Sequence, residues 1–218
     1  MNYQAIIFDL DGTLLDTIDD IASSMNAVLD FYGFPMHEVD KYKLMVGDGM
    51  EMLVRRALPE NHRDDSTVAE CSGRMNEIYT QNWHRFTKPY PGIESMLTEL
   101  GRDSVRMAIL SNKPHDFTRM VVSQLLGNWE FEQVLGAREG VPKKPDPSAA
   151  LEIAQSMSLS TSKFLYCGDT GTDMKTAVGS GMHAVGVLWG FRDAHELTAN
   201  GARILLKKPE DIFQLLQS

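Results

Sequence analysis

The segment from Ala5 to Thr17 constrains the fold of this chain more than any other, and it reads AIIFDLDGTLLDT. Its first four residues are all apolar, which predicts a strand buried on both faces, as in a parallel sheet. Asp9 and Asp11 follow that strand at its carboxyl end, where open α/β sheets place their ligands. Two carboxylates this close repel each other unless a cation or a shared proton relieves them. The segment therefore predicts either a site for a hard cation such as Mg²⁺ or two acids that cap a turn.

Composition limits the class of protein. The chain has 218 residues, of which 43% are hydrophobic, and this suits one large domain or one domain with an insertion. A formal net charge of −9 argues against nucleic-acid binding, and any anion site must supply its own local positive charge. Cys71 and Cys167 are far apart, which favours reduced core residues. We expect no signal peptide and no membrane-spanning segment, and hence a cytoplasmic protein.

Helical spacing dominates the first part of the chain after the opening strand. Apolar residues from Ile18 to Tyr32 predict a long amphipathic helix, with Thr17 as its N-cap and Gly33 as its C-terminal stop. Only helical spacing follows as far as about residue 85. We therefore expect an all-helical cap domain at residues 16–87, inserted directly after the first strand.

Strands and helices alternate in the remainder of the chain. Strands are predicted at 105–110, 131–135, 164–167, 184–188 and 204–206. Such alternation is typical of an α/β fold with a parallel sheet and helices on both of its faces. Residues 1–15 and 88–218 are expected to form this core.

Polar residues follow four of the predicted strands at their carboxyl ends. They are Asp9 and Asp11, then Ser111, Asn112 and Lys113, then Lys143 and Lys144, and then Asp169 and Asp173. Taken singly, each group has a simple structural explanation, because the acids, the serine and the asparagine can cap helices and the lysines can be solvated. Four such groups at one edge of one predicted sheet are harder to explain in this way, and together they predict an active site.

The acids in this set suit phosphoryl transfer through a carboxyl-phosphate. Asp9 is the candidate nucleophile, because a carboxylate is ionised at neutral pH without help from a base. Asp11 is the candidate acid for the leaving alkoxide and the candidate base for the attacking water. Asp9 and Asp169 are expected to hold Mg²⁺, with Asp173 as a further ligand or next to one.

The remaining polar groups suit phosphate binding. Ser111 is expected to donate to a phosphoryl oxygen, together with Asn112 and with backbone N–H groups at the start of the next helix. Lys144 is expected to neutralise developing negative charge and to brace Asp9. The expected partner of the chain is thus a small phosphorylated metabolite.

With these residues in place, the chain resembles the haloacid dehalogenase-like phosphatases. Four segments, in the same order and across essentially the whole chain, resemble the signature motifs of that family. They are Asp9-Leu10-Asp11-Gly12-Thr13, Ser111-Asn112, Lys144-Pro145, and Gly168-Asp169 with Asp173. The resemblance implies a Rossmann-like core with a mobile cap, and a role for the Asp11 backbone carbonyl as a further ligand of Mg²⁺. It also implies that Lys144, not Lys143, is the motif lysine.

Within the family, the chain is most similar to phosphoglycolate phosphatases. The segment from Val46 to Met50 resembles their cap loop, which makes Gly47, Asp48 and Gly49 candidate substrate contacts, although asparagine is more usual at position 48. An anion there disfavours a substrate carboxylate unless a cation compensates, and Lys41 and Lys43 are candidates. The segments 189–192 and 208–211 resemble the C-terminal section of these enzymes. The resemblance implies hydrolysis of 2-phosphoglycolate to glycolate and phosphate by a monomer or homodimer.

Several alternatives stay open. A phosphatase or phosphomutase of the same fold can act on a sugar phosphate, a nucleotide or pyrophosphate. A receiver-type signalling domain also uses an acidic pocket, but its phosphoacceptor lies on a later strand and it lacks the helical insertion. A true dehalogenase needs neither Mg²⁺ nor Asp11. A catalytically inactive binding or scaffold protein is the alternative of another class. Four residues count against it, and they are Asp9, Asp11, Lys144 and Asp169.

Overall fold

The computed structural model describes residues 3–216 of the chain. The chain divides into two compact units, which are Met1–Leu15 with Pro89–Ser218, and Asp16–Lys88. Two short strands, β2 (Leu15–Asp16) and β3 (Lys88–Pro89), pair with each other where the chain passes between the units.

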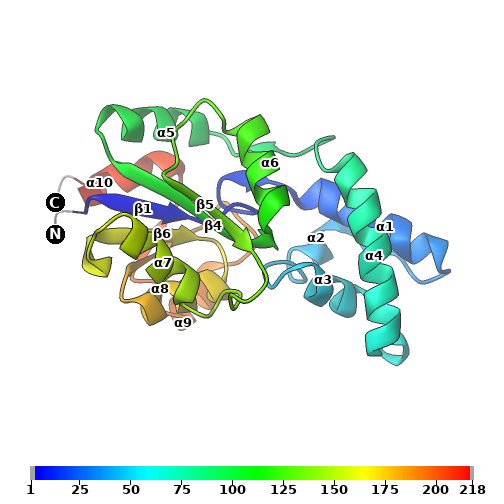
Figure 1. Cartoon of the computed structure of the whole chain (residues 1–218). Coiled ribbons are helices and arrows are strands. Elements are labelled where there is room, and N and C mark those ends of the chain that lie inside the picture. Colours follow the sequence, from blue (N-terminus) through cyan, green and yellow to red (C-terminus); the bar gives the residue numbers. More distant parts are fainter. Residues whose placement is uncertain (1–2, 217–218) are drawn as a thin grey trace. The chain divides into compact units, whose positions relative to one another are not determined.

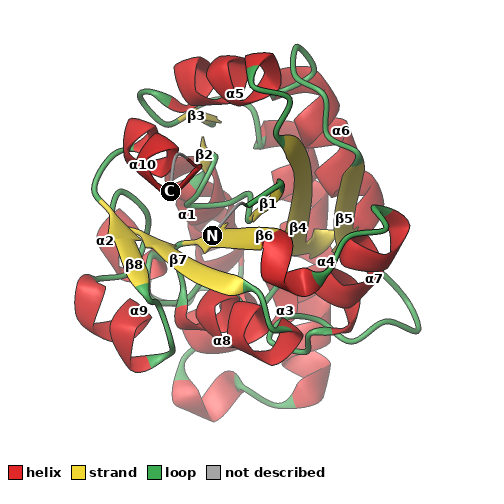
Figure 2. Cartoon of the chain, turned by 90° about the vertical axis from the view of Figure 1, so that its left-hand side faces the viewer, coloured by secondary structure: helices red, strands yellow, loops and turns green. Residues whose placement is uncertain are grey.

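A parallel six-stranded sheet forms the centre of the first unit (Figure 1 and Figure 2). Its strands are β1 (Ala5–Phe8), β4 (Arg106–Pro114), β5 (Gln133–Ala137), β6 (Phe164–Gly168), β7 (His183–Val187) and β8 (Ile204–Leu206). The strand order is β5-β4-β1-β6-β7-β8, and every neighbouring pair is parallel. The predicted α/β class with a parallel sheet is confirmed.

Helices cover both faces of this sheet (Figure 1). They are α5 (Ile93–Arg102), α6 (His115–Leu125), α7 (Ser148–Ser156), α8 (Gly171–Ser180), α9 (Ala194–Ala199) and α10 (Phe213–Leu216), with short 3₁₀ turns at Thr161–Lys163 and Pro209–Ile212. Ala5 and Ile7 of β1 pack into one core with α7, α8 and α9, whereas Phe8 faces α5 on the other side. Since β1 is buried on both faces, all of its side chains are apolar.

The register of the sheet fixes where the site forms. Phe8 at the end of β1 lies opposite Ile109 of β4 and Cys167 of β6. The chain continues from β1 to one side of the sheet through β4 and β5, and then returns to the other side through β6. Strand β1 therefore lies next to the topological switch point, where the carboxyl ends of parallel strands leave a crevice for a ligand.

The second unit is built from helices. They are α1 (Ile18–Phe31), α2 (Val39–Tyr42), α3 (Met50–Ala57) and α4 (Asp65–Asn82), with a 3₁₀ turn at Glu60–His62. Helix α4 packs against α1 and α3 through buried apolar side chains such as Met25, Leu53 and Met75. Buried Asp20 in the first turn of α1 accepts hydrogen bonds from the backbone N–H groups of Phe86 and Thr87, which ties that helix to the end of the unit.

The structure corrects two local predictions. Helix α1 does begin after Thr17 and ends before Gly33, whose φ is +70°. The Thr17 side chain makes no capping bond, however, because its backbone is not extended as a capping residue requires. Strand β4 continues to Pro114, beyond its predicted end at 110, and α6 begins only at His115, so Ser111 and Asn112 lie within the strand and do not cap a helix. No helix within residues 3–216 is long and apolar enough to cross a membrane.

Candidate active site

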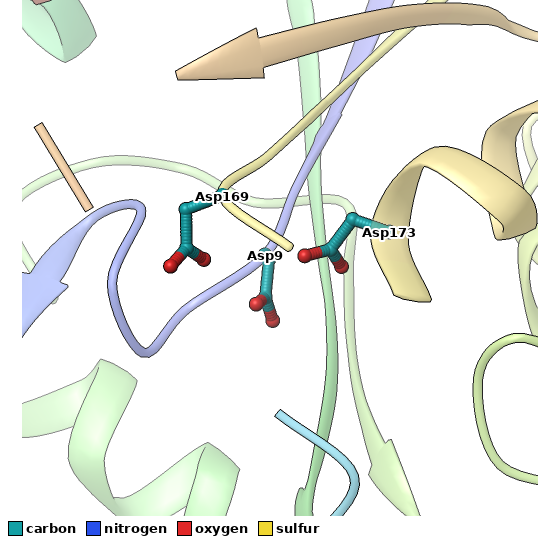
Figure 3. A group of neighbouring side chains, drawn as sticks. All are labelled: Asp9, Asp169 and Asp173. Carbon is teal, nitrogen blue, oxygen red and sulfur yellow. The ribbon is translucent and has the colours of Figure 1, made fainter. Parts of the chain in front are cut away.

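Three buried carboxylates meet at the carboxyl edge of the sheet (Figure 3). Asp9 follows β1, Asp169 follows β6, and Asp173 lies in the first turn of α8. Each offers an oxygen within 4.8 Å of the oxygens of the other two. Asp9 is 6% exposed, and Asp169 and Asp173 are fully buried. Asp169 and Asp173 are four positions apart in the sequence, and both are 160 or more positions from Asp9. The fold thus brings together acids from distant parts of the chain.

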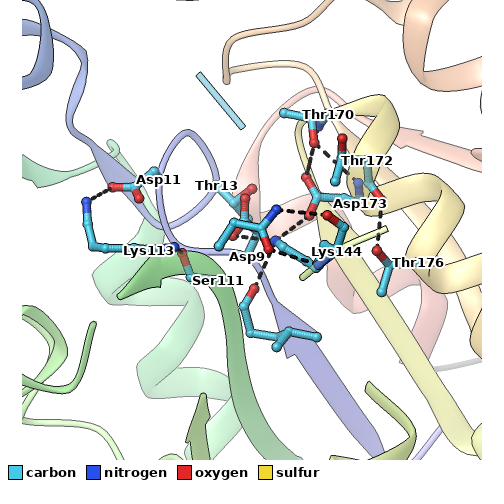
Figure 4. Close-up of polar contacts among 12 residues, drawn as sticks. Asp9, Asp11, Thr13, Ser111, Lys113, Lys144, Thr170, Thr172, Asp173 and Thr176 are labelled. Atoms are coloured by element: carbon cyan, nitrogen blue, oxygen red, sulfur yellow. Dashed lines mark hydrogen bonds and ion pairs between the residues drawn. The ribbon is translucent and has the colours of Figure 1, made fainter. Parts of the chain in front are cut away.

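Lys144 is the cation of this cluster (Figure 4). Its Nζ lies 2.8 Å from Asp9 Oδ1 and 2.7 Å from Asp173 Oδ1, and it donates to the carbonyl of Leu110 at 3.0 Å. Burial alone lowers the pKa of Lys144, but Asp173 and Asp9 outweigh it and hold that pKa well above its ordinary value. Lys143 is exposed, so the geometry favours Lys144 over its neighbour.

Asn112 holds the backbone of Lys144 in place. Its side-chain amide donates to the Lys144 carbonyl at 3.0 Å and accepts from the Lys144 N–H at 2.9 Å. Buried Ser111, one residue earlier in β4, accepts from the Lys113 N–H at 3.1 Å. The predicted contacts of Ser111 and Asn112 with phosphate stay predictions, while the amide of Asn112 has a structural task at Lys144.

Asp173 combines a capping role with its place in the acidic cluster. Its Oδ2 accepts from the Thr170 N–H at 3.1 Å and from the Thr170 hydroxyl at 2.6 Å, as part of a capping box at the start of α8. Its Oδ1 accepts from Lys144. The simple structural explanation for Asp173 is therefore true, and it does not exclude a role in the site.

The electrostatics of the cluster favour a bound cation. Burial and the neighbouring Asp173 raise the pKa of Asp9 to about 7 in the metal-free chain. Burial, Asp173 and Asp9 also raise the pKa of Asp169 well above its ordinary value. The ammonium group of Lys144 pairs with Asp9 and Asp173 but not with Asp169, so it offsets only part of the negative charge of the three buried carboxylates. This all-oxygen donor set fits a hard divalent cation such as Mg²⁺.

Asp11 is held apart from the acidic cluster. Its Oδ1 lies 2.8 Å from Lys113 Nζ, and the side chains of the two residues are 20% and 7% exposed (Figure 4). Lys113 belongs to the polar group that follows the predicted strand at 105–110, and no role was predicted for it. The signal was available, since Lys113 directly follows Ser111 and Asn112, but only the fold shows that it reaches Asp11.

The candidate cap residues lie in the second unit. Gly47 and Gly49 have φ values of +113° and +90° in the loop before α3, and Asp48 between them forms an ion pair with Arg56. Lys43 pairs with Asp40 at 2.8 Å. The structure thus pairs Asp48 with Arg56, which was not among the predicted cations. The predicted contact of this loop with substrate stays a prediction.

The sequence matches those of known proteins over most of its length. A family model described as haloacid dehalogenase-like hydrolase matches residues 6–187. A phosphoglycolate phosphatase from Pseudomonas putida is 31% identical over 216 residues, which cover 97% of this chain and 78% of the relative. Another, from Aliivibrio fischeri, is 27% identical, over 88% of this chain and 87% of the relative.

Solved structures show the same fold. A protein from Lactobacillus delbrueckii, provisionally described as a phosphoglycolate phosphatase, superposes with a TM-score of 0.93 at 28% identity, covering 99% of both chains. A haloacid dehalogenase-like family protein from Streptococcus pneumoniae superposes with a TM-score of 0.85 at 21% identity, also covering 99% of both chains. The whole chain, including its helical second unit, thus has counterparts of known structure.

Proposed function

Because the chain belongs to the haloacid dehalogenase-like hydrolases, we propose that it is a Mg²⁺-dependent phosphatase of small phosphate monoesters. The observation that carries this proposal is the buried group of Asp9, Asp169 and Asp173, whose charge one lysine only partly offsets. Asp9 and Asp169 would hold the metal ion, and the bonds from Asp173 to Lys144 and Thr170 suit a supporting place beside it. When bound, the ion offsets the repulsion between substrate phosphate and Asp9.

Asp9 and Asp11 carry out the two chemical steps of the proposed reaction. Asp9 attacks phosphorus, and the bond from phosphorus to the leaving oxygen breaks as an aspartyl-phosphate forms. Asp11 gives its proton to the leaving oxygen, and then takes one from the water that attacks the aspartyl-phosphate, so Asp9 is regenerated and phosphate is released. Lys144 touches Asp9 and orients its carboxylate for the attack on phosphorus.

The relatives make 2-phosphoglycolate the first substrate to test. Curated relatives near 30% identity over almost the whole chain are phosphoglycolate phosphatases. The test is a screen of phosphorylated metabolites of two to six carbons, with kcat/KM measured for each in Mg²⁺ and in EDTA. We expect the highest kcat/KM for 2-phosphoglycolate and no turnover in EDTA. A higher kcat/KM for a sugar phosphate or nucleotide would make that compound the proposed substrate in place of 2-phosphoglycolate. No turnover of any compound would indicate a binding protein.

Asp11→Asn is expected to lower kcat by about 10²- to 10⁴-fold, because a positioned acid and base contributes about that much. The amide cannot transfer the proton, but it has the size of the carboxyl group, so the fold and Mg²⁺ binding should persist. Rapid-quench measurement of phosphate release and of phospho-enzyme checks this. Release at the rate of the unmodified enzyme would remove Asp11 from the mechanism.

Binding of Mg²⁺ is expected to weaken as the pH falls below about 7. Asp9 must lose its proton to bind the ion, and its pKa in the metal-free chain is about 7. The apparent affinity should therefore fall by about tenfold per pH unit in the acidic range. Isothermal titration calorimetry at pH 6 and pH 8, in two buffers that differ in ionisation enthalpy, measures the affinity and the released proton. Equal affinity at the two pH values would contradict the prediction.

The same pKa gives the sign of the stability change. An acid whose pKa is higher in the folded than in the unfolded state binds more protons when the chain is folded. The contribution of Asp9 to stability is therefore full below its unfolded pKa near 4, and it is lost as the pH rises to its folded pKa of about 7. In EDTA, Asp9 should thus make the chain less stable at pH 7.5 than at pH 5. Mg²⁺ should raise Tm more at the higher pH.

A further inference from the structure

Both carboxylate oxygens of Asp169 are held by hydrogen bonds from other loops. The Thr13 hydroxyl donates to Oδ1 at 3.2 Å, and the Phe191 N–H donates to Oδ2 at 2.9 Å. Thr13 belongs to the loop after β1, and Phe191 to the loop after β7. Asp169 is fully buried, and Thr13 is 1% exposed. The direction of this carboxylate is therefore set by two loops that are far apart in the sequence.

Trp189 ties these two loops to each other. Its indole N–H donates to the Thr13 carbonyl at 2.9 Å, across 176 positions of sequence. Thr13 thus accepts from Trp189 with its carbonyl and donates to Asp169 with its hydroxyl. Phe191 lies two residues after Trp189, and its N–H bonds Asp169. The contacts therefore form a closed ring that runs from Asp169 through Thr13, Trp189 and Phe191 back to Asp169.

The ring has little room to adjust. A Cβ atom built on Gly12 would lie 2.3 Å from Asp169 Oδ2, and one built on Gly190 would lie 2.3 Å from Asp169 Cβ and from the Gly12 carbonyl oxygen. Both loops therefore approach Asp169 so closely that only glycine fits at positions 12 and 190. The Trp189 ring lines an apolar space together with Ile93, which anchors it on the side of the sheet that α5 covers.

We propose that Trp189 is a positioning residue for the metal site, which fixes Thr13 on Asp169 and so aims the remaining lone pairs of Asp169 at the ion. The inference rests on the proposed use of Mg²⁺. Trp189 itself has no predicted contact with metal or substrate, and it acts through the Thr13 carbonyl. Groups that orient a ligating carboxylate are worth about 10- to 100-fold in metal affinity.

The test compares Trp189 with a second tryptophan whose indole N–H bonds a threonine outside the acidic cluster. Trp129 is half-buried like Trp189, and its indole N–H also bonds a threonine, Thr98 Oγ1 at 3.0 Å, but neither residue belongs to the acidic cluster. Mg²⁺ affinity is measured by titration calorimetry for the unmodified chain, Trp189→Phe and Trp129→Phe. We expect Kd to rise by about 10- to 100-fold for Trp189→Phe and to stay unchanged for Trp129→Phe.

Three further measurements distinguish positioning from general destabilisation. Replacing Trp189 with a benzothiophene analogue of tryptophan, which exchanges the N–H for sulfur and keeps the ring shape, should weaken Mg²⁺ binding about as much as Trp189→Phe does, although the packing of the ring is kept. In a Thr13→Val background, the effect of Trp189→Phe on Kd should largely disappear, because the two act in series. At saturating Mg²⁺, kcat of Trp189→Phe should recover.

Each outcome bears on a different claim. If the unmodified chain binds no Mg²⁺, the proposed function fails and this inference fails with it. If the unmodified chain binds Mg²⁺ and both Trp189 replacements bind it within twofold of that affinity, the inference is overturned while the proposed function stands. Additive effects of Trp189→Phe and Thr13→Val would also overturn it.

Discussion

Asp9→Asn is expected to abolish phosphate release, with a fall in kcat of at least about 10⁴-fold. The reason is that an amide oxygen is a far weaker nucleophile than a carboxylate, and losses of this size are typical when a nucleophile is removed. Trapping experiments with labelled substrate should show no phospho-enzyme. Steady-state turnover and acid-quench trapping measure the two quantities.

The fold should survive this substitution and is expected to gain stability. Burial and Asp173 make the ionised form of Asp9 unfavourable in the metal-free chain. A neutral amide avoids that repulsion and can still accept a hydrogen bond from Lys144. In EDTA at pH 8, Tm of Asp9→Asn should thus equal or exceed that of the unmodified chain, so lost activity cannot be attributed to unfolding.

Asp103→Asn provides the matched control for Asp9→Asn. Asp103 is exposed at the end of α5, and its substitution exchanges the same chemical groups outside the acidic cluster. Its turnover and Mg²⁺ affinity should stay unchanged. Retention of more than a few per cent of activity by a freshly purified Asp9→Asn sample would remove Asp9 as the nucleophile and would favour direct attack by water.

The sequence predicted the parts of the site that local patterns encode. Strand β1 has the predicted bounds because four apolar residues in a row fit a strand buried on both faces. Asp9 and Asp169 each directly follow such a strand, so the topology of a parallel sheet alone brings them to one edge. Lys144 could be preferred to Lys143 only through the family resemblance, and burial now gives the physical reason for that choice.

The contacts that orient these residues could not be predicted. The bond from Trp189 to Thr13 and the ion pair of Lys113 with Asp11 join positions 176 and 102 residues apart, and no periodicity encodes such pairs. Helix α9 has six residues with one buried side chain, Leu197, which is too few to show helical spacing. Tertiary packing determines these contacts, and they exist only in the folded chain.

Lys144→Met is expected to destabilise the metal-free chain by about 3–5 kcal/mol at pH 8, because removing one partner of a buried ion pair leaves the other charge uncompensated. Lys144 Nζ contacts Asp9, Asp173 and the Leu110 carbonyl, and its side chain is 2% exposed. Methionine fills similar space but donates no hydrogen bond. Urea unfolding in EDTA measures the loss, and turnover should fall to the background as well.

Conditions that lower the charge of the cluster should reduce this loss, and they test its electrostatic origin. Acid protonates Asp9, so the difference in unfolding free energy between Lys144→Met and the unmodified chain should shrink from pH 8 to pH 5. Saturating Mg²⁺ should shrink it at pH 8 for the same reason. The exposed neighbour gives the control, since Lys143→Met should change stability by no more than about 0.5 kcal/mol. A loss that is equal at both pH values would mean that Lys144 stabilises the chain by packing, and that it does not balance the acids around it.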